Sequence, residues 1–179
     1  MKLSEQNKQD LLELARLSLI SEFYPDDTNL DFFDKKHLGI KQGAFVTLHK
    51  NNQLRGCIGK MTSDLPLYVT IEAMAKEAAF HDPRFSPVRE DELPEIEIEI
   101  SVLSPFEKIS YDAIEIGKHG LMLKHGYKSG VFLPQVPLEQ KWNKEEYIIN
   151  LFQKADVPYS DTNLKEAKLF GFTALVFGE

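Results

Sequence analysis

The chain has 179 residues, of which 42% are hydrophobic and 27% are charged, and its formal net charge at pH 7 is −7. This length accommodates one domain with a real core, alone or with a smaller lobe. The acidic balance argues against binding to duplex nucleic acid, because such proteins need many Lys and Arg residues to displace counterions.

Three further features concern the cellular location of the protein. No stretch approaches about 18 consecutive apolar residues, so we expect no membrane span. Glu5, Asp10 and Glu13 interrupt the apolar residues near the N-terminus, so we expect no signal peptide. The single cysteine, Cys57, cannot form an internal disulfide, which fits a reducing environment. We therefore expect a cytoplasmic protein.

The first third of the chain predicts a helix followed by a hairpin. Residues 4–21 carry apolar side chains at helical spacing after a serine that can cap the helix. Residues 43–50 and 53–59 predict two strands. Asn51 and Asn52 lie between them, and asparagine tolerates the positive φ that a tight hairpin turn needs.

The remainder predicts a helix at residues 66–80, a polar connector at 81–94 and an alternating strand at 95–103. A hairpin at 120–125 and 130–135, a third helix at 138–155 and a terminal strand at 169–179 follow. In the third helix Leu138, Trp142, Ile149 and Phe152 are expected on one side.

This order of elements predicts an α+β fold with a mainly antiparallel sheet flanked by helices. The regular β-α-β-α alternation of a doubly wound fold is missing. We expect a single domain over residues 1–179, with two lobes that divide near the polar connector at residues 81–94.

The stretch LRGCIG at residues 54–59 holds the only thiol. On a strand Arg55 and Cys57 share a face, and Gly56 and Gly59 remove side chains beside the sulfur, so that backbone or ligand can approach. Guanidinium groups and helix N-termini favour anions and reactive thiolates. Together with Lys60, which follows the strand, these residues indicate a reactive thiolate or an anion pocket.

A structural explanation of the same stretch stays open. A free cysteine is often simply packed in the interior, and glycine within a strand often marks a bulge. The strand at 95–103 presents glutamates on one face, and one of them could pair with Arg55 if the two strands are neighbours. We favour the simpler interpretation that these glutamates form an ordinary solvated face of the sheet.

The loop HDPRF at residues 81–85 is the second candidate. Asp82 can bond to the backbone two residues on and shape the turn. Arg84 is then either the ion partner of Asp82 or a clamp for a substrate. The chain has five histidines, among them His119, without H-E-x-x-H or C-x-x-C spacing, so we expect no metal site. The sequence does not indicate a cofactor.

Five stretches taken together resemble the AMMECR domain family, which includes AmmeMemoRadiSam system protein A of microbes. They are LRGCIG (54–59), DPRF (82–85), LPEIEIEISVLSPFEKI (93–109), KHGL (118–121) and LPQVPLEQKW (133–142). The resemblance covers nearly the whole chain. It implies an α+β fold with a larger lobe, a smaller lobe and a cleft near LRGCIG. It also implies a modification pathway shared with a radical SAM protein and a Memo-like protein.

The family pattern matches this chain at ten positions: Arg55, Gly56, Cys57, Gly59, Arg84, His119, Gly120, Pro134, Gln140 and Trp142. Many microbial relatives carry a second cysteine where this chain has residues 152–155, so a mechanism that needs two thiols is not expected here.

Two functional hypotheses follow, and the sequence does not separate them. In the first the protein is an enzyme or enzyme component. Its catalytic candidates are Cys57, Arg55, Arg84 and His119, and its candidates for binding a small-molecule or anionic ligand are Gly56, Gly59, Lys60, Asp82 and Gln140. In the second it is a non-catalytic binding or adaptor module of the same multi-protein system. A third hypothesis, association with nucleic acid, is disfavoured by the acidic balance.

Overall fold

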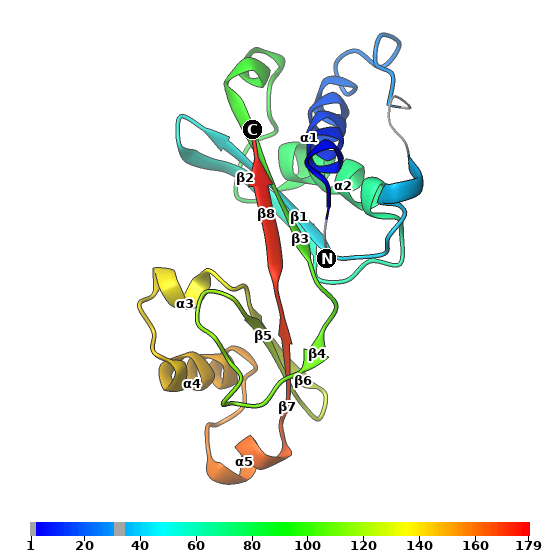
Figure 1. Cartoon of the computed structure of the whole chain (residues 1–179). Coiled ribbons are helices and arrows are strands. Elements are labelled where there is room, and N and C mark those ends of the chain that lie inside the picture. The colour runs from blue at the N-terminus through cyan, green and yellow to red at the C-terminus, as the bar shows by residue number, and fades with distance from the viewer. Residues whose placement is uncertain (1–2, 31–34) are drawn as a thin grey trace. The chain divides into compact units, whose positions relative to one another are not determined.

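The computed structural model describes residues 3–30 and 35–179, and its chain separates into two compact units (Figure 1). The first unit ends at Leu103 and includes the C-terminal residues Leu175–Glu179, and the second is Ser104–Ala174. Each contains helices and a four-stranded sheet, which confirms the predicted α+β class with antiparallel pairing. Within the described ranges, no helix is long and apolar enough to cross a membrane.

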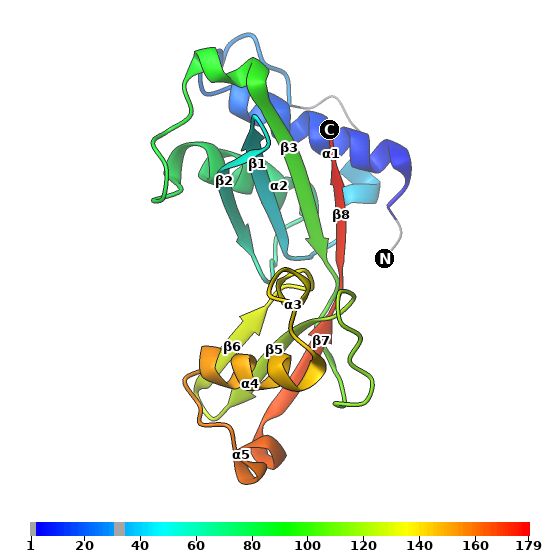
Figure 2. The same cartoon turned by 90° about the vertical axis from the view of Figure 1, so that its left-hand side faces the viewer.

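The first unit contains a sheet whose strand order is β2-β1-β3-β8, so β2 is an edge strand. Its elements are α1 (Glu5–Ile20), η1 (Lys35–Leu38), β1 (Ala44–Lys50), β2 (Gln53–Lys60), α2 (Leu67–Lys76), the π-helical turn η2 (Glu77–His81), η3 (Glu90–Glu95), β3 (Ile96–Leu103) and β8 (Ala174–Gly178). Helices α1 and α2 lie on one face of the sheet (Figure 2).

The core of the first unit follows from the predicted periodicities. Ser4 caps α1 by accepting a hydrogen bond from the Asn7 backbone N–H, and α1 buries Leu11, Ala15 and Leu19. β1 and β3 bury every second side chain, which places their other side chains on the face of the sheet opposite the helices. Thr47 belongs to that second face.

The hairpin between β1 and β2 has the predicted turn and a bulge. Asn51 and Asn52 have φ of 52° and 60°. Leu48 pairs with Gly56 and His49 with Leu54, so Arg55 is the extra residue without a partner on β1. The bulge changes the register, and Thr47 is therefore the residue opposite Cys57.

The second unit contains a sheet of order β4-β7-β5-β6. Its elements are β4 (Glu107–Lys108), β5 (Gly120–His125), β6 (Lys128–Phe132), α3 (Val136–Glu139), α4 (Lys144–Lys154), α5 (Asp161–Glu166) and β7 (Lys168–Phe172). Helix α4 buries Tyr147, Ile148, Leu151 and Phe152, which pack with Leu121 and Leu123 of β5 to form a separate core.

The predicted third helix and terminal strand differ from the structure, and the strand predicted at residues 130–135 is Lys128–Phe132. The third helix was expected over residues 138–155 but begins at Lys144, because Lys141 has a positive φ of 57° and Asn143 caps the new helix. Leu138 and Ile149 are exposed, so the expected stripe is wrong at these positions. The terminal strand is interrupted at Thr173 and supplies β7 to one sheet and β8 to the other.

The boundary between the units also differs from the predicted one. It falls at Leu103–Ser104 and Ala174–Leu175, whereas the polar composition of residues 81–94 suggested a division there. The physical reason is that this connector is bound along the edge of β2, through the contacts described below.

Candidate functional site

The backbone of Cys57 is held by a pair of side chains from the loop that follows η2. The Cys57 N–H donates to Asp82 Oδ2 at 2.9 Å, and the Cys57 carbonyl accepts from Arg84 Nη2 at 3.0 Å. An edge strand has unpaired backbone groups on its free side. Asp82 and Arg84 satisfy two of these groups in the place where a neighbouring strand would lie.

Asp82 is the centre of this arrangement. Its side chain is 1% exposed, and besides the Cys57 N–H it accepts from Arg84 N, Nε and Nη2 at 3.1, 2.9 and 2.7 Å. These hydrogen bonds, above all those from the Arg84 side chain, hold the pKa of Asp82 far below its usual value. The predicted turn role of Asp82 and its ion pair with Arg84 are both present.

The guanidinium of Arg84 is bound to the backbone of Cys57, the residue that carries the thiol. Cys57 is half-buried, and its Sγ is 3.3 Å from the hydroxyl of Thr47. Asp82 raises the pKa of Arg84 above its usual value, and Cys57 makes a smaller contribution in the same direction. The Arg84 side chain is 53% exposed. Its Nη1 has no hydrogen-bond partner within the described part of the chain, so it can receive a ligand.

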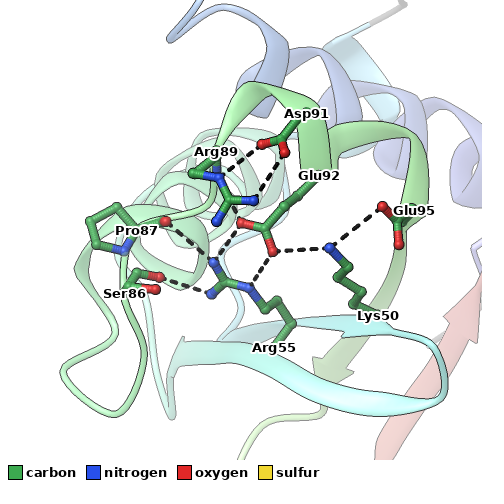
Figure 3. Close-up of polar contacts among 8 residues, drawn as sticks. All are labelled: Lys50, Arg55, Ser86, Pro87, Arg89, Asp91, Glu92 and Glu95. Carbon is green, nitrogen blue, oxygen red and sulfur yellow. Dashed lines mark hydrogen bonds and ion pairs between the residues drawn. The ribbon is translucent and has the colours of Figure 1, made fainter.

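Arg55 has a different role from the predicted one (Figure 3). Its Nε and Nη2 donate to the two carboxylate oxygens of Glu92 at 3.2 and 3.0 Å. Its Nη1 and Nη2 also donate to the carbonyls of Ser86 and Pro87 at 2.9 and 3.2 Å. The side chain is 12% exposed. Arg55 therefore binds the connector to β2 and is not positioned as the guanidinium beside the thiol.

Glu92 collects several donors in addition to Arg55. It accepts from the Arg89 N–H at 3.0 Å and from Lys50 Nζ at 3.3 Å, and Lys50 also pairs with Glu95 (Figure 3). Chiefly through the Arg55 hydrogen bonds, the pKa of Glu92 is lowered to about 2. Pairing of Arg55 with a glutamate of the 95–103 strand required β2 and β3 to be neighbours, and this condition is not met, because β1 lies between them.

The two glycines of LRGCIG accommodate the protein itself. A Cβ at Gly56 would lie 2.1 Å from the Ala78 carbonyl oxygen, and a Cβ at Gly59 would lie 2.2 Å from the Phe45 ring. The π-helical turn η2 thus packs its backbone directly on β2, and Asp82 follows immediately after it. Of the two possibilities left open by the sequence, close approach of backbone or of a ligand, protein atoms fill the space at both glycines.

The other predicted residues do not join this cluster. Lys60 is exposed at the end of β2, and a loop separates it from Leu67, where α2 begins. His119 and Gln140 belong to the second unit, where Gln140 is exposed after α3. No group of three or more His, Cys, Asp or Glu residues in the described ranges could hold a metal ion.

Sequence reasoning missed Thr47 and Glu92. Counting back from the Asn51-Asn52 turn in regular register would place residue 47 opposite Gly56, and only the bulge moves it opposite Cys57. Glu92 is one of several acidic residues in the connector, and its burial to 6% exposure has no local signal.

Comparison with known proteins agrees with the fold and covers nearly the whole chain. The AMMECR1 family model matches residues 12–177. Protein MJ0810 of Methanocaldococcus jannaschii is 37% identical over 93% of this chain and 82% of its own length. Protein Mbar_A1807 of Methanosarcina barkeri is 40% identical over 94% and 88%.

A solved structure supports the same assignment. The crystal structure of protein PH0010 from Pyrococcus horikoshii superimposes with a TM-score of 0.74 at 35% identity, and the match covers 94% of this chain and 89% of that one. Family model, relatives and fold are therefore consistent with one another, and the chain belongs to the AMMECR1 family.

Proposed function

We propose that this protein is an enzyme, or a component of one, that holds an anionic substrate group at Arg84 and uses the Cys57 thiol as a nucleophile. The observation that carries the proposal is the guanidinium of Arg84, which Asp82 holds against the backbone of Cys57. Buried Asp82 fixes the orientation of Arg84, whose side chain is 53% exposed and whose Nη1 has no acceptor among the described residues. A positioned thiol next to an anion-binding group is a recurrent arrangement in covalent catalysis.

In this proposal the remaining residues have supporting roles. Thr47 contacts the sulfur, and Arg55 positions the connector that carries Asp82 and Arg84. The resemblance to AmmeMemoRadiSam proteins suggests that the substrate comes from a modification pathway with a radical SAM protein and a Memo-like protein. Lys60 and Gln140 have no part in this mechanism.

A non-catalytic binding or adaptor module is the second candidate, and a separate observation favours it. The space beside Gly56 and Gly59 is filled by Ala78 and Phe45, and Arg55 is engaged in the protein. LRGCIG then serves as a scaffold, and Arg84 contacts a partner without covalent chemistry. This hypothesis predicts that Cys57→Ser preserves function and that Arg84→Met does not.

Alkylation of the single thiol by two reagents tests the first proposal. Iodoacetate carries a negative charge and iodoacetamide is neutral, and intact mass reports modification of Cys57 alone. We expect the ratio of the iodoacetate rate to the iodoacetamide rate to exceed that of N-acetylcysteine. Arg84→Met should lower the ratio about fivefold, since it removes the adjacent charge.

Arg89→Met is the matched control. Arg89 pairs with an aspartate two residues away, as Arg84 does, but it is exposed just before η3 and does not contact Cys57. The ratio of the iodoacetate rate to the iodoacetamide rate in Arg89→Met should equal that of the wild type. An unchanged ratio in Arg84→Met would refute an anion site at the thiol. A thiol that stays inert until the protein unfolds would overturn the nucleophile and favour the adaptor.

A further inference from the structure

The second unit contains a pocket of its own, which the proposed function does not use. It has a volume of about 260 Å³ and is lined by residues of β4, β7 and the segments beside them. His119, Lys108 and Thr173 contribute polar groups, and Ile109 and Phe172 contribute apolar walls. All lining residues belong to Ser104–Ala174, so the pocket is a feature of this unit alone.

The imidazole of His119 is oriented by a turn. The backbone N–H of Glu115 donates to His119 Nδ1 at 3.1 Å, and the backbone N–H of His119 donates to the Glu115 carbonyl at 3.0 Å. Gly117 provides the turn with a φ of 82°. Because a backbone N–H is always a donor, Nδ1 must accept, and the proton of the neutral ring lies on Nε2. The ring of His119 therefore offers one N–H donor.

Lys108 and Thr173 add a positive charge and a hydroxyl to the same lining. Neither side chain has a hydrogen-bond or ion-pair partner within the described ranges. Glu107 also lines the pocket and contributes the opposing charge. The pocket thus combines an oriented N–H, an ammonium and a hydroxyl with an apolar wall, a combination that is typical of sites for small organic ligands.

We propose that this pocket binds a small carboxylate that carries an apolar group. The carboxylate accepts from His119 Nε2 and Lys108, since charge-assisted hydrogen bonds are the strong ones in such a setting. The apolar group contacts Ile109 and Phe172. The inference does not depend on Cys57 chemistry, because every residue that it uses lies in the second unit.

Benzoate is the probe for this proposal, and the full chain is titrated by ¹H–¹⁵N NMR. Benzoate should shift the amide resonances of Thr173 and Lys108 with a Kd on the order of 1 mM. Benzamide, its neutral analogue, and inorganic phosphate, which has no apolar part, should each bind at least about fivefold more weakly.

Substitutions then test the individual groups. His119→Asn places an amide oxygen where Nδ1 lies, which preserves the acceptor for Glu115 while the Nε2 donor is lost, and affinity should fall about tenfold. Lys108→Met should weaken benzoate binding about threefold, because it removes a positive charge that attracts the carboxylate. Glu107→Gln should strengthen benzoate binding about twofold, because it removes a negative charge that repels the carboxylate. Lys124→Met, on β5 and outside the pocket lining, is the matched control and should have no effect.

Several outcomes would overturn the proposal. Benzoate that shifts no resonance of the lining residues excludes the site. Equal binding of benzamide excludes carboxylate recognition, and equal binding of phosphate excludes the apolar contact. An unchanged affinity in His119→Asn excludes the imidazole as the donor. Any of these results leaves the alkylation ratio of Cys57 unaffected, so the two proposals can fail separately.

Discussion

Replacing Gly56 with alanine should lower the free energy of unfolding by about 3 kcal/mol. The new Cβ would lie 2.1 Å from the carbonyl oxygen of Ala78. That neighbour is backbone, so no rotamer change can relieve the overlap, and β2 and η2 must move apart. Urea unfolding monitored by circular dichroism measures the change, and Cys57 alkylation should accelerate as the strand loosens.

Gly126→Asn is the control for loss of a glycine as such. Gly126 has a φ of 58°, and a Cβ at this position would meet no atom within 4 Å. Asparagine tolerates this conformation, so we expect a change within about 0.5 kcal/mol. If Gly56→Ala were equally mild, the direct packing of η2 on β2 would be refuted.

Replacing Arg55 with methionine should also be strongly destabilising, by about 3–5 kcal/mol. The substitution leaves the carboxylate of Glu92, which is 8% exposed, without its bidentate partner, and it frees the carbonyls of Ser86 and Pro87. Arg55→Lys should recover only part of the loss, because an ammonium group cannot bind both carboxylate oxygens in parallel.

The effect of Arg55→Met should depend on pH with a definite sign. The pKa of Glu92 is about 2 in the folded protein and 4.5 in the absence of its partners. A lowered pKa contributes stability that is present above about pH 4.5 and is lost as the pH falls toward 2. The difference in unfolding free energy between wild type and variant should therefore be largest above about pH 4.5 and shrink below it, in urea titrations at each pH.

A double variant supplies the control. Arg55→Met combined with Glu92→Leu removes both charges and should be more stable than Arg55→Met alone, because no buried carboxylate is left without its bidentate partner. Equal stability of wild type and Arg55→Met at neutral pH would contradict a clamp and return Arg55 to the role of a free anion-binding residue.

Local patterns were sufficient to predict much of the first unit. The Asn51-Asn52 turn, the Ser4 cap and the alternation in β3 depend on neighbouring residues, and each is present. The interruption at Thr173 was not predictable from the continuous apolar run around it. It arises because the strands on either side belong to different sheets, which is a property of the whole topology.

The sequence predicted several residues that belong to the site, but only part of what each residue does there. Cys57, Asp82 and Arg84 come together, and the ion pair of Asp82 with Arg84 follows from their spacing of two residues. The partner of Arg55 could not be predicted, because the bulge and the folding of the connector onto β2 decide it. Polar composition alone made the connector resemble a linker between lobes.

The loop carrying Asp82 and Arg84 closes the edge of β2 at Cys57, and the amide hydrogen-exchange rate of Cys57, measured by NMR, tests this closure most directly. We predict protection in the wild type and exchange that is about tenfold faster or more in Asp82→Ala. Asp91→Ala should cause no change, because Asp91 is exposed and pairs with Arg89. A Cys57 amide that exchanges as fast in the wild type as in Asp82→Ala would contradict the closure.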